Sequence, residues 1–400
     1  MDSRHVEVLL DVGELGTEIR IRNARVPDAR RIQVLYAEEY GNKYPISTIY
    51  DREKTRQALR EENIFWLVGE HDGKIIASLF FAIDPAQRLA KAGGAVVSRL
   101  YRKHNLAYTM MKIIQENLIK TRAIDIVYGT TRTVSTAPQY LTEHLSFTPL
   151  GIFPNAHKVY ENETHTLSCW FSPDAWKKRK KPVRLIEEIT PFYDIACRAL
   201  AEKKVELGPA GVVALPPAER KGRVELIPFE FLDAERFVSE RYKKFKSDGM
   251  FENMYVPFHE PNALLISLDQ KTEIYLHIEP LDRYCMILGG HTDVDDASLV
   301  LRSAAQELRK HNTSYIEVLI DAYSPQLQRQ ALDARFMPSA YFPMMLLSGR
   351  KRLDRLAFSM SFDMLDFSNV ALTSYYQEFL TEYLKIWQNL YIDYPFRSVK

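Results

Sequence analysis

The chain carries the same octapeptide pattern twice, and this repetition constrains its fold more than any other feature. FTPLGIFP occupies residues 147–154 and FMPSAYFP occupies residues 336–343, so both read F-x-P-x-x-x-F-P at an offset of 189 residues, the difference between 147 and 336. Eight matching positions could arise by chance, but the predicted helices and strands around both copies also recur in one order. A chain of 400 residues is too long for one ordinary core. We therefore expect two copies of one fold.

Apolar periodicity in the first half predicts alternating element types. Strands are expected at residues 19–22, 64–70, 74–83, 93–100, 124–130 and 158–171, and helices at 28–40, 52–61, 107–120 and 137–145. The strand–loop–helix–strand unit over residues 93–130 predicts a parallel pair in a sheet that is otherwise antiparallel. The fold class is thus α/β (α+β), with a mixed, mostly antiparallel sheet flanked by helices.

The second half repeats this order after an intervening segment. Strands are expected at residues 224–229, 263–268, 272–278, 284–290, 315–320 and 355–362, and helices at 233–246, 295–310, 326–334 and 375–392. Between the halves, a basic run (177–184), a helix at 185–201 and a Pro/Gly cluster (208–222) indicate a connector whose basic face is solvated. The predicted domains are 1–171, a linker with a helix at 172–223, a second domain at 224–365 and a C-terminal helix at 366–400.

Composition excludes several classes of protein. The 53 basic and 52 acidic residues nearly balance, which argues against a nucleic-acid partner. Three cysteines (Cys169, Cys197 and Cys285) have no CxxC spacing, so we expect no disulfide framework and no metal site. No apolar run approaches the length of a membrane span, and the first residues do not resemble a signal peptide. We expect a cytoplasmic protein with no membrane partner.

The end of the strand predicted at 93–100 is the most informative place for chemistry. The polar loop YRKHN follows it, and a helix begins directly afterwards. A helix amino terminus presents free N–H groups and about half a positive charge, which favours phosphate oxygens. Arg102, Lys103 and His104 add side-chain charge, so this loop is a candidate phosphate site.

At these residues the sequence resembles the GCN5-related N-acetyltransferase (GNAT) superfamily. Its pyrophosphate loop reads Q/R-x-x-G-x-G/A; here Arg102 and Ala107 fit, and Asn105, a residue that tolerates positive φ, stands in place of the glycine. Residues 141–147 resemble the family's L-Y-x-x-x-G-F stretch, with Ser146 in place of its glycine. The resemblance covers residues 18–171 in element order and identifies a tandem GNAT protein.

The resemblance implies an acyltransferase that moves an acetyl or other acyl group from acyl-CoA to an amine of a small molecule or peptide. The donor, acetyl-CoA or another acyl-CoA, would lie between the strands predicted at 93–100 and 124–130. The residues implied in binding it, by backbone or side chain, are Val96, Val97, Ser98, Arg102, Lys103, His104, Asn105, Leu106 and Ala107.

The second copy differs at the equivalent loop. Asp293, Asp295 and Asp296 follow the strand at 284–290, and these carboxylates would repel a pyrophosphate. We therefore expect a degenerate copy without a donor site, which packs, shapes the acceptor pocket or dimerises. Asp295 or Asp296 is the expected N-cap of the following helix.

Proton transfer is less well defined by the sequence. The family's frequent acid, a tyrosine on the fourth helix, aligns with Thr142, and the nearby Tyr140 is the candidate to replace it. The family's frequent glutamate base aligns roughly with Lys91. Glu38 and Glu39 end the first helix near the implied acceptor site and are the candidate bases.

Three hypotheses follow from these residues. The first is the acyl-CoA-dependent N-acyltransferase; the second is a tandem GNAT enzyme whose donor is an aminoacyl-tRNA or a carrier-bound acyl group. The third is a non-enzymatic acyl-CoA-binding scaffold. The aromatic terminal helix could pack within the chain or against a second subunit, which leaves a homodimer open.

Overall fold

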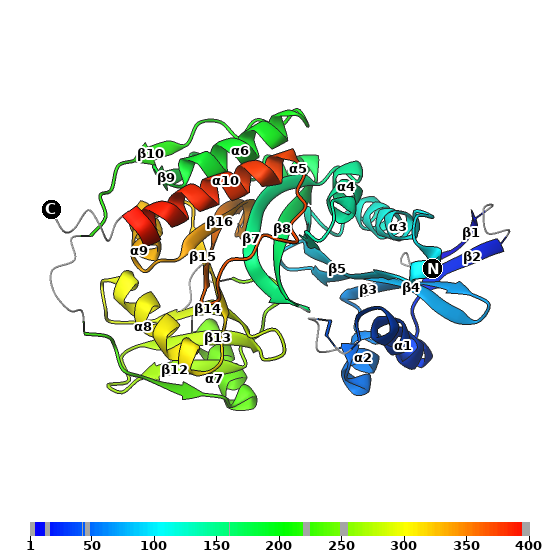
Figure 1. The fold of residues 1–400 in the computed structure, drawn as a ribbon, viewed down its shortest axis with the longest axis horizontal. Coiled ribbons are helices and arrows are strands. Elements are labelled where there is room, and N and C mark those ends of the chain that lie inside the picture. The colour runs from blue at the N-terminus through cyan, green and yellow to red at the C-terminus, as the bar shows by residue number, and fades with distance from the viewer. Residues whose placement is uncertain are drawn as a thin grey trace.

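The computed structural model describes residues 5–12, 17–41, 43–44, 49–159, 161–218, 225–248 and 255–393. Within these ranges, fifteen strands form one continuous sheet that extends through both halves of the chain (Figure 1). Its order is β1-β2-β3-β4-β5-β6-β8-β7-β16-β17-β15-β14-β13-β12-β11. The β5–β6 and β14–β15 pairs are parallel and the other neighbours are antiparallel, as the sequence predicted.

The first repeat contains β1 (Glu7–Val12), β2 (Thr17–Asn23), α1 (Ala29–Tyr40), α2 (Arg52–Ala58), β3 (Ile64–His71), β4 (Lys74–Asp84), β5 (Leu89–Val97), α3 (Leu106–Lys120), β6 (Ile126–Arg132), α4 (Ala137–His144), β7 (Thr148–Lys158) and β8 (Asn162–Phe171). Strand β1 was not predicted. The closing strand predicted at 158–171 corresponds to β8, whereas β7, which forms a hairpin with it, was not predicted. The proline and glycine residues of β7 disfavoured a strand prediction there. In the structure, both prolines lie beside register shifts of the strand.

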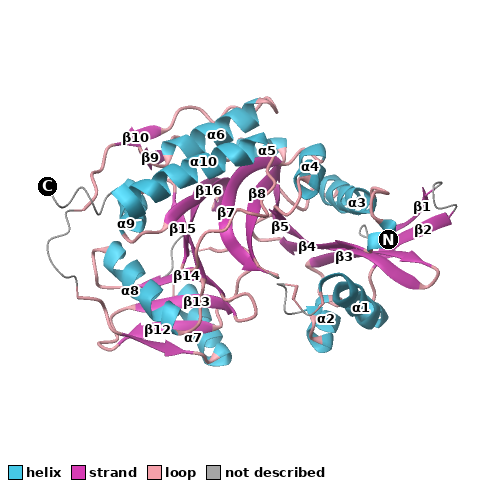
Figure 2. Cartoon of the chain, viewed as in Figure 1, coloured by secondary structure: helices cyan, strands magenta, loops and turns pink. Residues whose placement is uncertain are grey.

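The second repeat contains β11 (Phe229–Leu232), α7 (Glu235–Ser247), β12 (Ala263–Ser267), β13 (Glu273–Glu279), β14 (Tyr284–His291), α8 (Ala297–Lys310), β15 (Tyr315–Asp321), α9 (Pro325–Asp333), β16 (Met337–Ser348) and β17 (Lys351–Ser361). Its strand order mirrors that of β2 to β8. The strand predicted at 224–229 begins at residue 224, which lies outside the described residues. The strand observed there is β11, which begins at residue 229, where the predicted strand ends. Helices flank both half-sheets (Figure 2).

The two repeats meet at the duplicated octapeptide. Strand β7 pairs with β16 in antiparallel orientation, and Gly151 lies opposite Ala340. These residues hold the same place in the two octapeptides, so equivalent edges pair about an approximate two-fold axis. Phe147 and Phe336, which open the octapeptides, are both fully buried. The pairing removes two exposed sheet edges and joins the halves into one sheet.

The segment between the repeats is folded, and most of its basic run is exposed as predicted: Lys177, Lys180, Lys181 and Arg184 are exposed, and Arg179 is an exception. It forms α5 (Pro173–Trp176), β9 (Arg184–Ile186), α6 (Thr190–Ala201) and β10 (Gly211–Val213). Arg179, within the basic run, is buried, and its Nη2 lies 2.6 Å from Asp354 Oδ2. The partner lies 175 residues away in sequence, so local composition could not reveal this buried ion pair.

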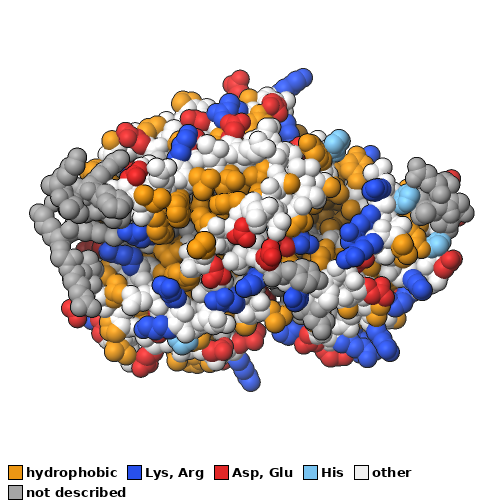
Figure 3. All heavy atoms as spheres, in the orientation of Figure 1, with side chains coloured by type: hydrophobic (Ala, Val, Ile, Leu, Met, Phe, Trp, Pro, Cys, Tyr) orange, Lys and Arg blue, Asp and Glu red, His pale blue; other side chains and the backbone are white. Residues whose placement is uncertain are grey.

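Helix α10 (Ser374–Gln388) closes the chain and packs within it. It lies beside α6 over the β7–β16 join (Figure 1). Tyr376, Phe379 and Tyr383 of this helix are buried. In the part of the chain that the structure describes, no helix combines the length and apolarity needed to cross a membrane. Figure 3 shows basic and acidic side chains interspersed over one face.

Candidate active site

Strands β5 and β6 separate partway along their length. Their parallel register runs from Leu89↔Ile126 to Ala92↔Gly129 and ends there. Beyond this point the backbone of residues 93–97 faces β6 without a strand partner on that side. Gly94 has φ +63°, and the Tyr36 hydroxyl donates to its carbonyl oxygen, so a bulge bends β5 at the start of the gap.

The loop after β5 has the backbone shape that the resemblance requires. Asn105 is in the left-handed region (φ +56°, ψ +17°), where the family's motif has glycine. Its side chain makes no capping hydrogen bond to α3. The first N–H groups of an α-helix have no intrahelical acceptor, so α3 offers donors to an anion.

Basic side chains surround this loop. Arg102 and Lys103 are exposed, and His104 is half-buried. A hollow of about 420 Å³ adjoins them, lined by Glu39, Tyr40, Ala95, Val96, Val97, Arg99, Arg102 and Arg132. The hollow is therefore bordered by the part of β5 that has no strand partner and by arginine side chains from both sides of the gap.

The predicted bases on α1 occupy different environments. Glu38 is exposed. Glu39 is 6% exposed, forms an ion pair with Arg102 and accepts a hydrogen bond from the backbone N–H of Arg99 at 3.0 Å. Glu39 thus holds the loop through two contacts.

The candidate acid, Tyr140, lies on α4 with half of its side chain exposed. Thr142, which aligns with the family tyrosine, is buried, and its hydroxyl donates to the Gln139 carbonyl oxygen at 2.8 Å. The roles given to Tyr140, Glu38 and Glu39 stay predictions. Ser146, in place of the second family glycine, has φ +65°.

A cavity of about 470 Å³ lies where the two repeats face each other. The first repeat contributes Trp66 and Phe80 from its central strands and Phe153 from its octapeptide. The second contributes Tyr284 and Phe342, the octapeptide partner of Phe153. Gly93 and Thr130, where β5 and β6 separate, also line it, so the gap opens into the cavity.

Two ionisable side chains of opposite sign line this cavity. Burial lowers the pKa of Lys91, on β5, and raises the pKa of Glu317, on β15, to about 7. Their charges interact through space, but no ion pair joins them. Lys91 was noted in the sequence; Glu317 was missed, although a lone carboxylate in the apolar strand YIEVLI was a usable signal.

Histidines form much of the remaining polar lining. Burial lowers the pKa of His165 to about 4 and also lowers the pKa of His259 and of His277, so these rings are neutral near pH 7. His157 Nδ1 bonds to Asp282. Nothing in the sequence groups these residues, because they come from different repeats.

The equivalent loop of the second repeat is filled by its own carboxylate. Asp296 is the N-cap of α8, as predicted, and accepts a hydrogen bond from Ser298 N at 2.9 Å. This acid occupies the place where an anion would bind at α3.

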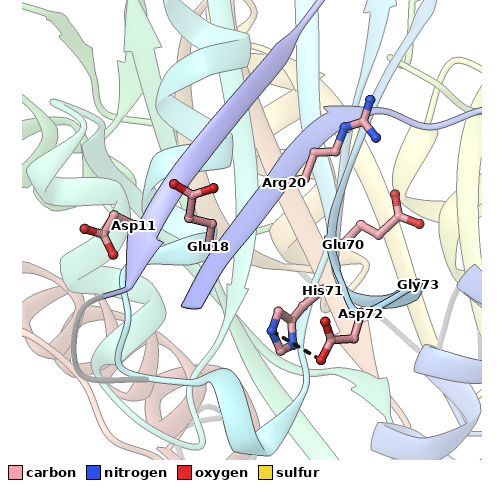
Figure 4. A pocket seen from close by; sticks show the side chains of 7 residues that line it. All are labelled: Asp11, Glu18, Arg20, Glu70, His71, Asp72 and Gly73. Carbon is pink, nitrogen blue, oxygen red and sulfur yellow. Dashed lines mark ion pairs between the residues drawn. The ribbon is translucent and has the colours of Figure 1, made fainter. Parts of the chain in front are cut away.

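A third hollow lies at the outer hairpin and is separate from this site (Figure 4). Glu70, which lines it, pairs with Arg22 and Arg31, while His71 Nδ1 lies 2.8 Å from the Tyr101 hydroxyl. Hydrogen bonds from Arg22, which outweigh burial, lower the pKa of Glu70. Among the described residues, no group of three or more His, Cys, Asp or Glu is placed to hold a metal ion.

Comparisons with known proteins give structural but no sequence matches. No family model and no curated protein matches the chain. Similar solved structures include a ribosomal-protein-S5-alanine acetyltransferase from Vibrio fischeri (14% identity, 42% of this chain, 98% of that chain, TM-score 0.35). Another is a GNAT-family acetyltransferase from Streptococcus pneumoniae (16% identity, 38% of this chain, 99% of that chain, TM-score 0.35). A third is an N-acetyltransferase from Staphylococcus aureus Mu50 (17% identity, 39% of this chain, 99% of that chain, TM-score 0.34).

The predicted fold class, a mixed and mostly antiparallel sheet flanked by helices, is confirmed by the topology of the chain itself. Each repeat has one parallel pair in an antiparallel sheet, and a helix follows the first strand of that pair.

Proposed function

We propose that this protein transfers an acetyl or other acyl group from acyl-CoA to an amine bound in the cavity between the repeats. One observation carries the proposal: the gap between β5 and β6 has the basic loop and its hollow at the outer end and the cavity at the inner end. A thioester in this gap would meet an amine in the cavity.

The loop residues fit the donor. The N–H groups at the start of α3, with Arg102 and Lys103, would bind the pyrophosphate. The backbone of Val96 and Val97 would hold the pantetheine arm, although the Val97 carbonyl oxygen already accepts from Arg102 Nε at 3.1 Å. The second repeat would bind no donor, because Asp296 caps α8.

The reaction needs an uncharged amine. Its nitrogen attacks the thioester carbonyl carbon, a C–N bond forms, and the C–S bond breaks to release the thiolate. Backbone N–H groups of β5 in the gap would stabilise the oxyanion. One proton must leave the ammonium before attack, and the thiolate takes up another.

We propose Glu317 as the base, because its carboxylate lines the cavity and its raised pKa suits proton transfer near neutral pH. Glu39 would instead orient Arg102 and the loop, since it is already bonded to both. Tyr140 remains the predicted acid for the thiolate.

Calorimetric binding of CoA and acetyl-CoA tests the donor site. Wild-type protein should bind both, and Lys103→Glu, on an exposed side chain, should weaken binding at least about tenfold by placing a carboxylate beside the pyrophosphate. Arg102→Glu should weaken it further. The matched control is Asp293→Asn in the second repeat, which should leave affinity unchanged.

Absence of binding to either CoA species would refute the donor assignment, and so would unchanged affinity in both loop variants. Thiol release from acetyl-CoA in the presence of amines then separates an enzyme from a scaffold. Binding without amine-dependent thiol release would contradict the proposed catalysis.

A further inference from the structure

We infer that the acceptor is a small zwitterion, an amine that also carries a carboxylate, as in a free amino acid. This inference rests on the proposed function, because it names the chemical class of the acceptor in that reaction. Its structural basis is the pair of opposite charges, Lys91 and Glu317, that the two repeats contribute to the lining of one cavity.

Lys91 provides the cationic side of this cavity. Within the described residues its ammonium has no hydrogen bond and no ion pair, and its Nζ lies 5.9 Å from the centroid of the Tyr128 ring. A half-buried cation without an ionic partner is costly, so the site favours a ligand that brings an anion. A substrate carboxylate would supply it.

Glu317 provides the anionic side. It projects from β15 of the second repeat, where the first repeat has Tyr128. Lys91 and His157 of the first repeat act on its charge, and Tyr284 lines the same cavity. No ion pair of the described residues neutralises it, so it can accept a substrate ammonium.

Two further carboxylates, Glu279 and Asp282, also line the cavity. Asp282 is already bonded to His157 and to the backbone N–H of Lys158. Aromatic rings such as Trp66 and Phe342 supply apolar walls. A zwitterion placed between Lys91 and Glu317 would satisfy both, whereas an uncharged amine leaves Lys91 unpaired and a diamine adds a second cation beside it.

This placement also orders the reaction. The carboxylate pairs with Lys91, and the ammonium gives one proton to Glu317. The freed lone pair forms the C–N bond, the C–S bond breaks, and the second proton from nitrogen passes to the thiolate or to solvent. The products are the N-acyl amino acid and CoA.

Thermal shift and calorimetry on the full chain test the inference without turnover. The probes are glycine, leucine, phenylalanine, glutamate and lysine, each beside its carboxamide, together with 1,4-diaminobutane. At least one amino acid should bind about tenfold more tightly than its carboxamide. Lys91→Met, which installs the residue found at the equivalent Met286, should remove this preference, and Glu317→Gln should weaken binding of the same amino acid.

Acetyl-CoA affinity measured on the same samples serves as the folding control, since both substitutions lie outside the loop. No binding by any amino acid, equal or tighter binding of the carboxamides or the diamine, or an undiminished preference in Lys91→Met would each overturn the inference. Acetyl-CoA binding in those cases would leave the proposed function standing, so the two failures are distinguishable.

Discussion

Replacement of Gly151 by alanine should loosen the join between the two repeats. Gly151 on β7 lies opposite Ala340 on β16, and the two strands approach too closely for a second methyl group. An added Cβ would lie 2.2 Å from Ala340 Cβ, 2.5 Å from Ala340 Cα and 2.5 Å from the Ser339 carbonyl oxygen. Two of these three atoms are backbone, so no side-chain rotation relieves the clash.

The cost follows from these distances. Carbon atoms in contact normally lie about 3.5–4.0 Å apart, so the strands must separate by more than about 1 Å. Overpacking of this kind costs about 1–3 kcal/mol, and the backbone contacts favour the upper value. At about 2.1 cal/mol/K per residue, the unfolding entropy of a chain of 400 residues is about 0.8 kcal/mol/K, so a 3 kcal/mol loss lowers Tm by about 3–4 °C.

Thermal unfolding followed by circular dichroism measures this effect. Gly211→Ala is the matched control, because it is also a strand glycine, and an added Cβ there would lie 3.4 Å from the nearest atom, the Val183 carbonyl oxygen. Its stability should change by no more than about 1 kcal/mol, which corresponds to about 1 °C in Tm. If the Tm of Gly151→Ala equals that of the wild type, the idea that the pairing of equivalent strands holds the repeats together is refuted.

Two further predictions concern a backbone position and a carboxyl group. Ser146→Gly should raise the free energy of unfolding by about 1 kcal/mol, because Ser146 has φ +65° and glycine adopts this conformation without strain. Denaturant unfolding measures this free energy, and a lower value for the variant than for the wild type would contradict the prediction. Burial raises the pKa of Glu317 to about 7, and a base must be deprotonated to accept a proton, so kcat/KM should rise as pH increases through about 7. Glu317→Gln should remove this rise in a pH–rate profile with acetyl-CoA, and an unchanged profile would exclude Glu317 as the base.

Local patterns in the sequence were sufficient to predict the duplicated architecture and the left-handed backbone of the loop after β5. Strand and helix periodicity, the N-cap at Asp296 and the left-handed Asn105 depend on a few neighbouring residues, which the sequence displays directly. The charged residues of the two equivalent loops are also adjacent in the sequence. The contrast between Arg102-Lys103-His104 in the first repeat and three aspartates in the second therefore distinguished the repeats from the sequence alone.

Only the tertiary structure decided how the copies combine. The octapeptides were recognised as equivalent, yet nothing in either one says that their strands pair with each other, since Gly151 and Ala340 are 189 residues apart. The burial of Arg179 against Asp354 and the meeting of Lys91 with Glu317 likewise depend on contacts between distant segments. Burial and charge pairing are properties of these non-local contacts, and they created a cavity that neither repeat contains by itself.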